Sequence, residues 1–360
     1  MRKIMKIGIL TFHWATNYGA VLQCFALQKH LESMGHEVKV INYKPRQYND
    51  NIYTFLRFRK FLNLREYINN RKKESALCKF RYEYLHQTKR IYQCKDMASL
   101  ASQFDIIISG SDQVLNPSFL LSGEGRGIVT PTYFLGFPFK GTRIGYALSF
   151  GCVTYPEKAR EIAAEYIKDF DIISVREKTG VDIVQSMGRD DAFVVPDPTL
   201  LIESRFYHQL ADNHINPNPN QYIYSFFIRN IAERKNAICN ILKGKHILWN
   251  NKDGDYTMQG WLNKIKHSEF VVTDSFHCVV MCLKLNKPFV VITENNGNVG
   301  MNDRLYTLLE KCDLIKCILH KSQIGNIEKV FAMDVKWKDV DSALLEYSEE
   351  GKSFLEKYFK

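Results

Sequence analysis

The stretch that most constrains the fold lies at residues 268–292 and reads SEFVVTDSFHCVVMCLKLNKPFVVI. Its first apolar run, at 270–273, has the length and β-branched content of a buried parallel strand. Good N-cap residues follow at 273–275, so a helix is expected from Phe276 to about residue 285. A second apolar run at 289–292 completes a strand–helix–strand unit. This pattern predicts an α/β protein with a parallel sheet.

His277 falls in the first turn of the expected helix. Unpaired backbone N–H groups and the positive end of the helix dipole favour an anion there. The same field disfavours imidazolium, which would keep the ring neutral and able to take or relay a proton. Ser275, Phe276 and Cys278 are next to His277 in the sequence. Asp274 follows the preceding strand, and its role could be structural or in binding. The alternative interpretation is a partly buried histidine at a helix start with no chemical role.

Composition sets the broad class of the protein. The length of 360 residues suggests two or three domains. The content of 45% hydrophobic and 24% charged residues is ordinary for a globular protein. No run approaches the ~20 apolar residues of a membrane-spanning helix, and no signal peptide is visible. The nine cysteines form no CxxC pair, which favours reduced thiols in a cytoplasmic protein. No paired metal ligands are evident, so neither a metal nor a bound cofactor is predicted.

The net charge of +10 is concentrated in residues 44–95, which contain 14 Lys/Arg and four Asp/Glu. An apolar stripe runs through the same segment, and residues 50–95 are expected to form two or three basic helices. One interpretation is a solvated helical face whose stripe packs on a domain. The other is contact with an anionic partner, such as a membrane surface or a lipid diphosphate. Nucleic acid is not expected, because no motif specific to it occurs.

A strand, a loop and a helix open the chain over residues 5–34, without the GxGxxG fingerprint of dinucleotide binding. Asn17, Tyr18 and Gly19 lie where the loop meets the helix, which is where open α/β sheets bind ligands. These residues are therefore candidates for contact with a substrate. In the alternative interpretation, Asn17 only caps the helix and Gly19 only permits close packing.

The buried strand expected at residues 104–109 runs into a second polar turn. Ser111, Asp112 and Gln113 offer hydroxyl, carboxylate and amide groups at the carboxyl end of the sheet, as a substrate-binding turn would. The alternative is an Asx-turn that merely shapes the loop. Further short strands are expected at 133–135 and 143–147.

Arg176 follows another short strand, at residues 172–175, and precedes a helix. It could contact substrate, or it could lock the domain by pairing with Glu177 or Asp197. We favour the second role, because Asp197 is a natural partner.

Two arginines in the second half of the chain suit a carboxylate or phosphate, because the guanidinium presents a fixed fork of donors. Arg229 is expected at the carboxyl end of a strand at 222–228. Arg304 follows the Gly/Asn-rich loop 294–302 and opens a helix. The alternatives are a surface arginine at 229 and neutralisation of Arg304 by Asp303.

These elements predict two Rossmann-like domains that face each other across a cleft. The first domain is expected at 1–200 and includes the basic 44–95 segment. A polar, Pro-broken linker follows at 201–220. The second domain is expected at 221–338, and a C-terminal helix at 339–360.

Several motifs in the same order resemble the polysaccharide pyruvyl transferase family, and the likeness runs from about residue 6 to about residue 309. The motifs are NYGA at 17–20 with Gln23, GSDQVLN at 110–116, ISVRE at 173–177, PDPTLL at 196–201, and TDSFH at 273–277 followed by NKPFV at 286–290. The chain departs from the family wording at Cys278, where the family has glycine, and at Leu115, where it has tryptophan.

The resemblance implies a fold like the two-domain B-type glycosyltransferases. It also implies transfer of a pyruvyl group from phosphoenolpyruvate, as co-substrate, to a sugar of a surface polysaccharide or its lipid-linked precursor, which forms a cyclic ketal. His277 would be the general acid/base. Donor binding would fall to Arg229, Ser275, Phe276, Cys278 and Arg304, and acceptor binding to Asn17, Tyr18, Gly19, Ser111, Asp112 and Gln113.

Two other functions compete with this interpretation. One is a glycosyltransferase that uses a nucleotide sugar in the same kind of site. The other is a non-catalytic protein that binds a membrane surface through residues 44–95. The expected location is the cytoplasm, with the inner membrane surface as a contact, and the sequence does not name the acceptor sugar.

Overall fold

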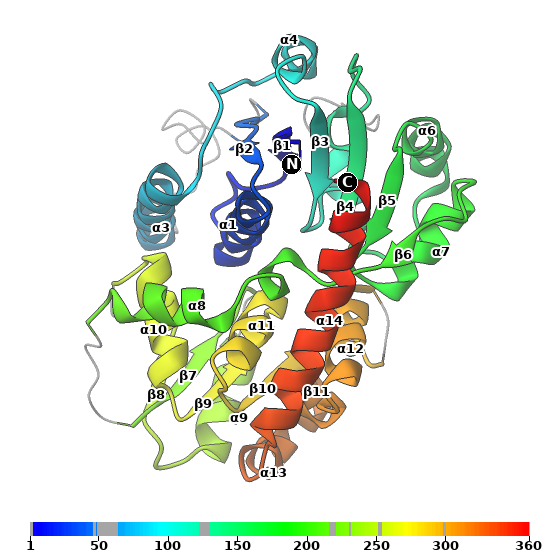
Figure 1. Cartoon of the computed structure of the whole chain (residues 1–360). Coiled ribbons are helices and arrows are strands. Elements are labelled where there is room, and N and C mark those ends of the chain that lie inside the picture. The colour runs from blue at the N-terminus through cyan, green and yellow to red at the C-terminus, as the bar shows by residue number, and fades with distance from the viewer. Residues whose placement is uncertain are drawn as a thin grey trace. The chain divides into compact units, whose positions relative to one another are not determined.

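The computed structural model (Figure 1) divides into two compact units, each built around a parallel sheet. The first unit comprises Met1–Leu201 with Glu350–Lys360, and the second comprises Ile202–Glu349. The α/β class with two Rossmann-like domains, predicted from the sequence, is confirmed. The residues that the structure describes are 3–45, 48, 64–121, 130–215, 221–229, 232–250, 254–297 and 300–359.

Among its described residues, the first unit has a six-stranded sheet in the order β2-β1-β3-β4-β5-β6, with every pair parallel. Figure 1 shows helix α1 in front of this sheet. The order reverses between β1 and β3, so the loops after these two strands flank the topological switch point, where open α/β sheets bind ligands. The strands are β1 (Lys6–Leu10), β2 (Glu37–Val40), β3 (Ile106–Gly110), β4 (Thr142–Leu148), β5 (Ile172–Val175) and β6 (Phe193–Val194). The helices are α1 (Tyr18–Ser33), α3 (Leu64–Tyr84), α4 (Met97–Ala101), α5 (Pro117–Leu120), α6 (Glu157–Ile167) and α7 (Lys178–Ser186).

The described part of the second unit repeats this plan with five parallel strands in the order β11-β10-β9-β7-β8. Its switch point lies between β7 and β9, so the loops after these strands flank the expected ligand position. The strands are β7 (Ile223–Phe226), β8 (Ile247–Trp249), β9 (Phe270–Thr273), β10 (Phe289–Thr293) and β11 (Ile318–His320). The helices are α8 (Ser204–Asp212), α9 (Ala232–Ile241), α10 (Met258–His267), α11 (Phe276–Lys284), α12 (Asp303–Lys311) and α13 (Ile327–Phe331).

The strand–helix–strand unit that anchored the sequence analysis forms β9, α11 and β10. All nine residues of α11 are buried, as is every residue of β9 and β10. Each fully buried Val or Leu side chain contributes roughly 1.5–3 kcal/mol, so this unit is a main source of stability for the second domain. It also fixes the helix start that carries His277.

One predicted strand is wrong. Residues 133–135 were expected to be extended, but Thr132–Phe134 form a 3-10 helix, and Leu135 has a φ of 55°. Pro131 precedes the turn with a φ of −75°, which suits a helical turn better than a strand. Tyr133 and Phe134 are buried here as core side chains, so their apolar signal came from packing rather than from strand pairing.

The stretch expected as a linker at 201–220 contains helix α8. Its Tyr207, Leu210 and Ala211 are buried. Asn263 of α10 donates to the carbonyl oxygens of Ala211 and His214, at 2.9 Å each, so the helix belongs to the second unit. Residues 216–220 of the expected linker lie outside the described residues.

In its described part, the basic segment forms one long helix, α3, followed by extended chain. The described residues after α3 form isolated bridges with the β2 side of the sheet, between Val40 and Gln87 and between Tyr43 and Ile91. Residues 49–63, where a further helix was expected, are outside the described part of the chain.

The last helix, α14 (Trp337–Tyr358), has residues in both units. Its final part, from Glu350, is grouped with the first unit, where Phe354 packs against Tyr146 and Phe193 at centroid distances of 5.8 and 5.3 Å. In the described part of the chain, no helix combines the length and apolarity needed to cross a membrane.

Candidate functional site

In the first unit, hydrogen bonds join the two loops at the switch point. The Thr11 hydroxyl, directly after β1, donates to the carbonyl oxygen of Ser111, directly after β3, at 3.0 Å. Gln23 of α1 donates in turn to Thr11 Oγ1 at 2.9 Å and to the carbonyl oxygen of Ala20 at 2.8 Å. This buried chain of bonds holds the two predicted acceptor loops in register with helix α1.

Asn17 is the N-cap of α1. Its backbone is extended, and its Oδ1 accepts from the amides of Gly19 at 2.9 Å and Ala20 at 3.5 Å. Tyr18 and Gly19 are buried, and the Tyr18 ring lies under the Lys73 ammonium of α3 at 4.4 Å. Asn17 therefore shapes the helix start, and it is the half-buried member of the three predicted residues.

The second predicted acceptor turn contains one buried and two half-buried residues. Ser111 is fully buried, and its hydroxyl donates to Asp197 Oδ2 at 2.8 Å. Asp112 has a φ of 67°, and its Oδ1 accepts from the amide of the next residue, Gln113, at 2.9 Å. Gln113 Oε1 accepts from Asn116 at 2.9 Å. Asp112 and Gln113 are thus the more accessible groups of this turn.

Gly151, after β4, packs tightly against the same turn. Its φ is 62°, and a Cβ atom there would lie 2.5 Å from Gln113 Oε1 and 2.6 Å from Asn116 Nδ2. Both the left-handed backbone and the close approach require glycine at this position. A third loop therefore sets the position of Gln113.

A buried ionic network holds the acceptor turn through Asp197, which accepts from both Ser111 and Arg176. Arg176 Nη1 donates to Asp197 Oδ2 at 2.9 Å, and Arg176 Nε lies 3.6 Å from Glu177 Oε2. Burial opposes the charged guanidinium, but Asp197 and Glu177 raise the pKa of Arg176. Glu177 also accepts from the Ser149 hydroxyl at 2.6 Å. The structure thus places Arg176 between the two partners considered in the sequence analysis.

His13 was not singled out from the sequence. It lies in the loop after β1, is 1% exposed, and its Nδ1 lies 3.2 Å from the carbonyl oxygen of Thr11. Burial lowers the pKa of His13 to about 4, against the raising effect of the Thr11 contact. Its position directly after a buried strand was the available signal, because that is where ligand-binding residues gather in this type of sheet.

In the second unit, Asp274 links the two loops at the switch point. It follows β9 directly, and its carboxylate accepts from the Ile228 amide at 2.7 Å and the Arg229 amide at 3.2 Å, in the loop after β7. Burial raises the pKa of Asp274, although both amides act in the opposite direction. Asp274 therefore holds the backbone of the predicted donor-binding arginine.

His277 lies in the first turn of α11, as expected. Ser275 is the N-cap, and its Oγ accepts from the Cys278 amide at 3.4 Å. The His277 ring is 7% exposed and meets the Phe276 ring edge-on at 5.2 Å. Cys278 is fully buried and hydrogen-bonds to Cys282, so its side chain points into the core.

The structure brings both predicted donor arginines to this helix start. Arg304 of α12 lies over the Phe276 ring, at 5.3 Å from Cζ to the centroid. Arg229 Nη2 approaches Met301 Sδ at 3.8 Å, one turn before Arg304. Arg304 thus contacts the helix start itself. Arg229 is instead tied to it through Asp274, which holds its backbone, and through Met301. Both arginines are half-buried.

A cluster of ion pairs around Glu294 lies at the same edge of the sheet. The sequence analysis did not single out these residues. Glu294, directly after β10, pairs with Arg234 of α9 and with Lys321, at 3.3 Å for the latter. Its carbonyl oxygen lies 3.0 Å from His320 Nε2 at the end of β11. Glu294 follows its strand as Asp274 follows β9, and this shared position was the signal that could have found it.

The described residues contain no group of three or more His, Cys, Asp or Glu side chains arranged to hold a metal ion. All nine cysteines are free thiols. Burial raises the pKa of Cys312 and of Cys317 to about 12, so these two are not reactive thiolates near neutral pH.

A family model described as polysaccharide pyruvyl transferase matches residues 17–296, a span that runs from the N-cap of α1 past β10. The chain belongs to the polysaccharide pyruvyl transferase family. The matched span includes Arg229, Asp274 and His277, whereas Arg304 lies beyond its end. A search of curated proteins found no match to the chain.

Solved structures share the fold of this pyruvyl transferase family member at low sequence identity. A UDP-N-acetylglucosamine 2-epimerase from Methanocaldococcus jannaschii, in complex with UDP-GlcNAc and UDP, aligns with a TM-score of 0.52 and 12% identity over 98% of this chain and 99% of its own. A structure described as a putative UDP-N-acetylglucosamine 2-epimerase from Listeria monocytogenes aligns with a TM-score of 0.53 and 10% identity over 94% and 90%. At these identities the likeness shows the fold alone.

Proposed function

We propose that this protein transfers the pyruvyl group of phosphoenolpyruvate to two hydroxyls of one sugar, forming a cyclic ketal on a surface polysaccharide or its lipid-linked precursor. The observation that carries the proposal is the convergence of Arg229 and Arg304 on the helix start that bears His277. Phosphoenolpyruvate carries a phosphate and a carboxylate. Two guanidinium forks and a helix N-terminus are suited to those anionic groups.

The reaction requires one proton to move to carbon. Protonation of the CH₂ carbon of the enol turns it into a methyl group and makes the adjacent carbon electrophilic. One sugar hydroxyl adds to that carbon, phosphate leaves with its bridging oxygen, and the second hydroxyl closes the ring. Of the two hydroxyl protons released, one replaces the proton delivered to carbon and the other leaves with phosphate. A positioned imidazole can make such transfers near neutral pH, which we assign to His277.

The acceptor side is proposed for the switch point of the first unit. Asp112 and Gln113 are half-buried there, and Asn17 caps the adjacent helix. Ser111, Tyr18 and Gly19 are buried and would support the acceptor loops rather than reach the sugar. This division follows from the exposure of each side chain.

The test is calorimetric titration of the whole chain with phosphoenolpyruvate, and in parallel with UDP-N-acetylglucosamine. We expect phosphoenolpyruvate to bind, and each of Arg229→Ala and Arg304→Ala to weaken it by about tenfold or more, since a hydrogen bond to a charged group contributes roughly 1.5–3 kcal/mol. Arg205→Ala is the matched control, because Arg205 is exposed in the first turn of α8, where it pairs with Glu203 and lies over the neighbouring Phe206 ring. Binding of the nucleotide sugar alone would favour a glycosyltransferase and overturn the proposal.

A further inference from the structure

Helix α3 carries most of the described part of the basic segment, and it has an inner and an outer face. On the inner face, Leu77, Phe80 and Arg81 are buried. The Phe80 ring packs against Phe25 of α1 at 5.8 Å and against Tyr84 at 4.5 Å. The apolar stripe read from the sequence is therefore a packing face of the first unit.

The inner face also holds the loop between β1 and α1. Glu74 accepts from the Thr16 hydroxyl at 2.7 Å, and it pairs with Arg81. Arg81 Nη1 donates to the carbonyl oxygen of His13 at 3.4 Å. With Lys73 over Tyr18, these contacts attach α3 to the loop that ends at Asn17. A partner that binds α3 would therefore lie next to the proposed acceptor loop, to which α3 is attached.

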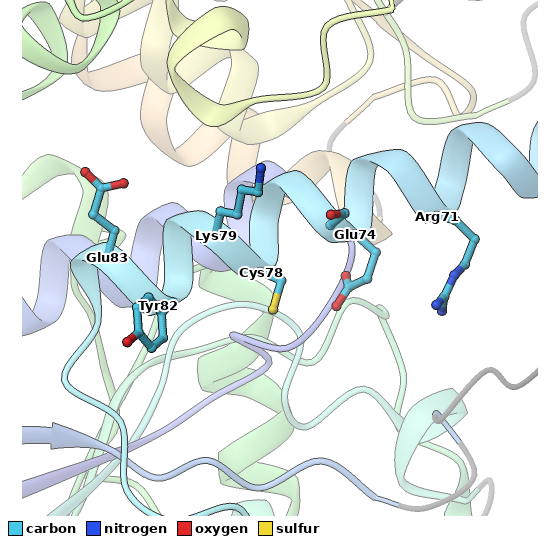
Figure 2. Close-up of a pocket in the computed structure, with 7 residues that line it drawn as sticks. Arg71, Glu74, Cys78, Lys79, Tyr82 and Glu83 are labelled. Carbon is cyan, nitrogen blue, oxygen red and sulfur yellow. The ribbon is translucent and has the colours of Figure 1, made fainter.

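The outer face of α3 is basic and carries an exposed aromatic ring. Figure 2 shows Cys78 and Tyr82 projecting to one side of the helix in that view, and Lys79 and Glu83 to the other. Tyr82 is 89% exposed and Ile68 is 44% exposed. An open hollow of about 830 Å³ lies against this face. The described residues that line it are Arg71, Glu74, Ser75, Cys78, Lys79, Tyr82 and Glu83.

The exposed charged side chains of this segment are mostly positive. Among described residues 67–95, the exposed cationic side chains outnumber the exposed acids by six to one, Glu83 being the acid. Glu74, the other acid of this stretch, also lines the hollow, but its carboxylate is half-buried and is engaged by Thr16 and Arg81. The exposed cations are Arg71, Lys72, Lys79, Lys89, Arg90 and Lys95.

We propose that the outer face of α3 docks on the surface of an anionic lipid bilayer. Lys and Arg near such a surface are attracted to anionic headgroups, and an exposed Tyr ring suits the interface because it is apolar with a polar tip. Charge complementarity selects this partner. The consequence for the acceptor rests on the proposed function: docking through α3 would bring the β1–α1 loop to a lipid-linked saccharide.

The test is co-sedimentation of the whole chain with vesicles of phosphatidylcholine alone and of phosphatidylcholine mixed with phosphatidylglycerol. We expect binding only to the mixed vesicles, weakening as salt is raised. The variant Arg71→Glu, Lys72→Glu, Lys79→Glu should bind about a hundredfold more weakly, since each cation contributes about 1 kcal/mol at such a surface. Lys329→Glu, Lys336→Glu, Lys338→Glu is the matched control, with the same charge change at exposed positions of the second unit.

Each result decides the proposal. Equal binding to both vesicle types, or equal loss in the two triple variants, would overturn it. Binding to single-stranded polynucleotide without binding to mixed vesicles would overturn it in favour of nucleic acid. Phosphoenolpyruvate titration of the wild-type chain, run beside the vesicle assay, separates the two proposals. A wild-type chain that binds vesicles but not phosphoenolpyruvate retains docking and loses the proposed reaction, and the reverse result loses docking alone.

Discussion

Asp274 and Arg229 are 45 residues apart, yet the Asp274 carboxyl group accepts hydrogen bonds from the Arg229 amide at 3.2 Å and from the neighbouring Ile228 amide at 2.7 Å. The contact spans the switch point of the second sheet, from the loop after β9 to the loop after β7. The contact fixes the backbone from which the Arg229 side chain extends, because that backbone cannot shift without breaking a hydrogen bond to the Asp274 carboxyl group.

Asp274→Asn should therefore weaken phosphoenolpyruvate binding indirectly, through the position of Arg229. An amide side chain has one acceptor oxygen, and its NH₂ group would face a backbone N–H. Loss of one such bond is expected to reduce affinity by about tenfold, measured by calorimetry. Asp212→Asn is the control, since Asp212 is exposed on α8 and pairs with Lys266 at the surface. Unchanged affinity in Asp274→Asn would show that this contact does not position Arg229.

His277→Ala should separate turnover from binding. If His277 moves the proton, its loss should lower the rate of phosphate release by about 10²–10⁴-fold, measured with an acceptor found by screening. Affinity for phosphoenolpyruvate should change little, because both arginines remain. The control is His246→Ala, which removes an exposed imidazole just before β8. A variant at position 277 that keeps wild-type turnover would remove this residue from the mechanism.

Much of the fold could be predicted from the sequence because its strands are short apolar runs and its helices have clear starts. The strand at 270–273 and the helix from Phe276 lie where the sequence placed them. The failure at 133–135 has a physical cause. Tyr133 and Phe134 are apolar because they fill the core, and a 3-10 turn after Pro131 buries them as well as a strand would. Apolar character alone does not distinguish these two conformations in a run of three residues.

The site was less readable than the fold. A motif pointed to His277, and position at a strand end or a helix start pointed to Arg229 and Arg304. In the structure Arg304 lies over Phe276 at the helix start, and Arg229 reaches Met301. The sequence could not show that Asp274 would hold the Arg229 backbone, because a contact across 45 residues depends on strand order. Nor could it show that Ser111 would turn inward to Asp197, since exposure is set by packing.

The pH dependence of stability should contain a contribution from His13. Burial lowers the pKa of His13 to about 4, below its ordinary value of 6.5. Between these values the unfolded chain binds more protons, so this contribution is complete above pH 6.5 and is lost as the pH falls toward 4. We expect about 2 kcal/mol of stability to be lost through His13 between pH 7 and pH 4.5.

Chemical denaturation of wild type and His13→Asn at both pH values measures this contribution. The variant should be less sensitive to acid than wild type by that amount, whatever its stability at pH 7. His246→Asn, at an exposed position, should keep the wild-type difference between the two pH values. Identical pH dependence in wild type and His13→Asn would contradict the assignment.

Gly151→Ala should disturb the acceptor turn through Gln113. The left-handed backbone alone, with a φ of 62°, costs an alanine roughly 1–2 kcal/mol. In addition, the new methyl group would displace Gln113 from Asn116, and a hydrogen bond of that kind contributes about 0.5–1.5 kcal/mol. Gly188→Ala is the matched control, because Gly188 also has a positive φ, of 92°, but no atom within 4 Å of its Cβ position. Denaturant titration should therefore show a larger loss for Gly151→Ala than for Gly188→Ala. Equal losses would mean that the turn around Gln113 yields freely, and that Gly151 is required only for its backbone conformation.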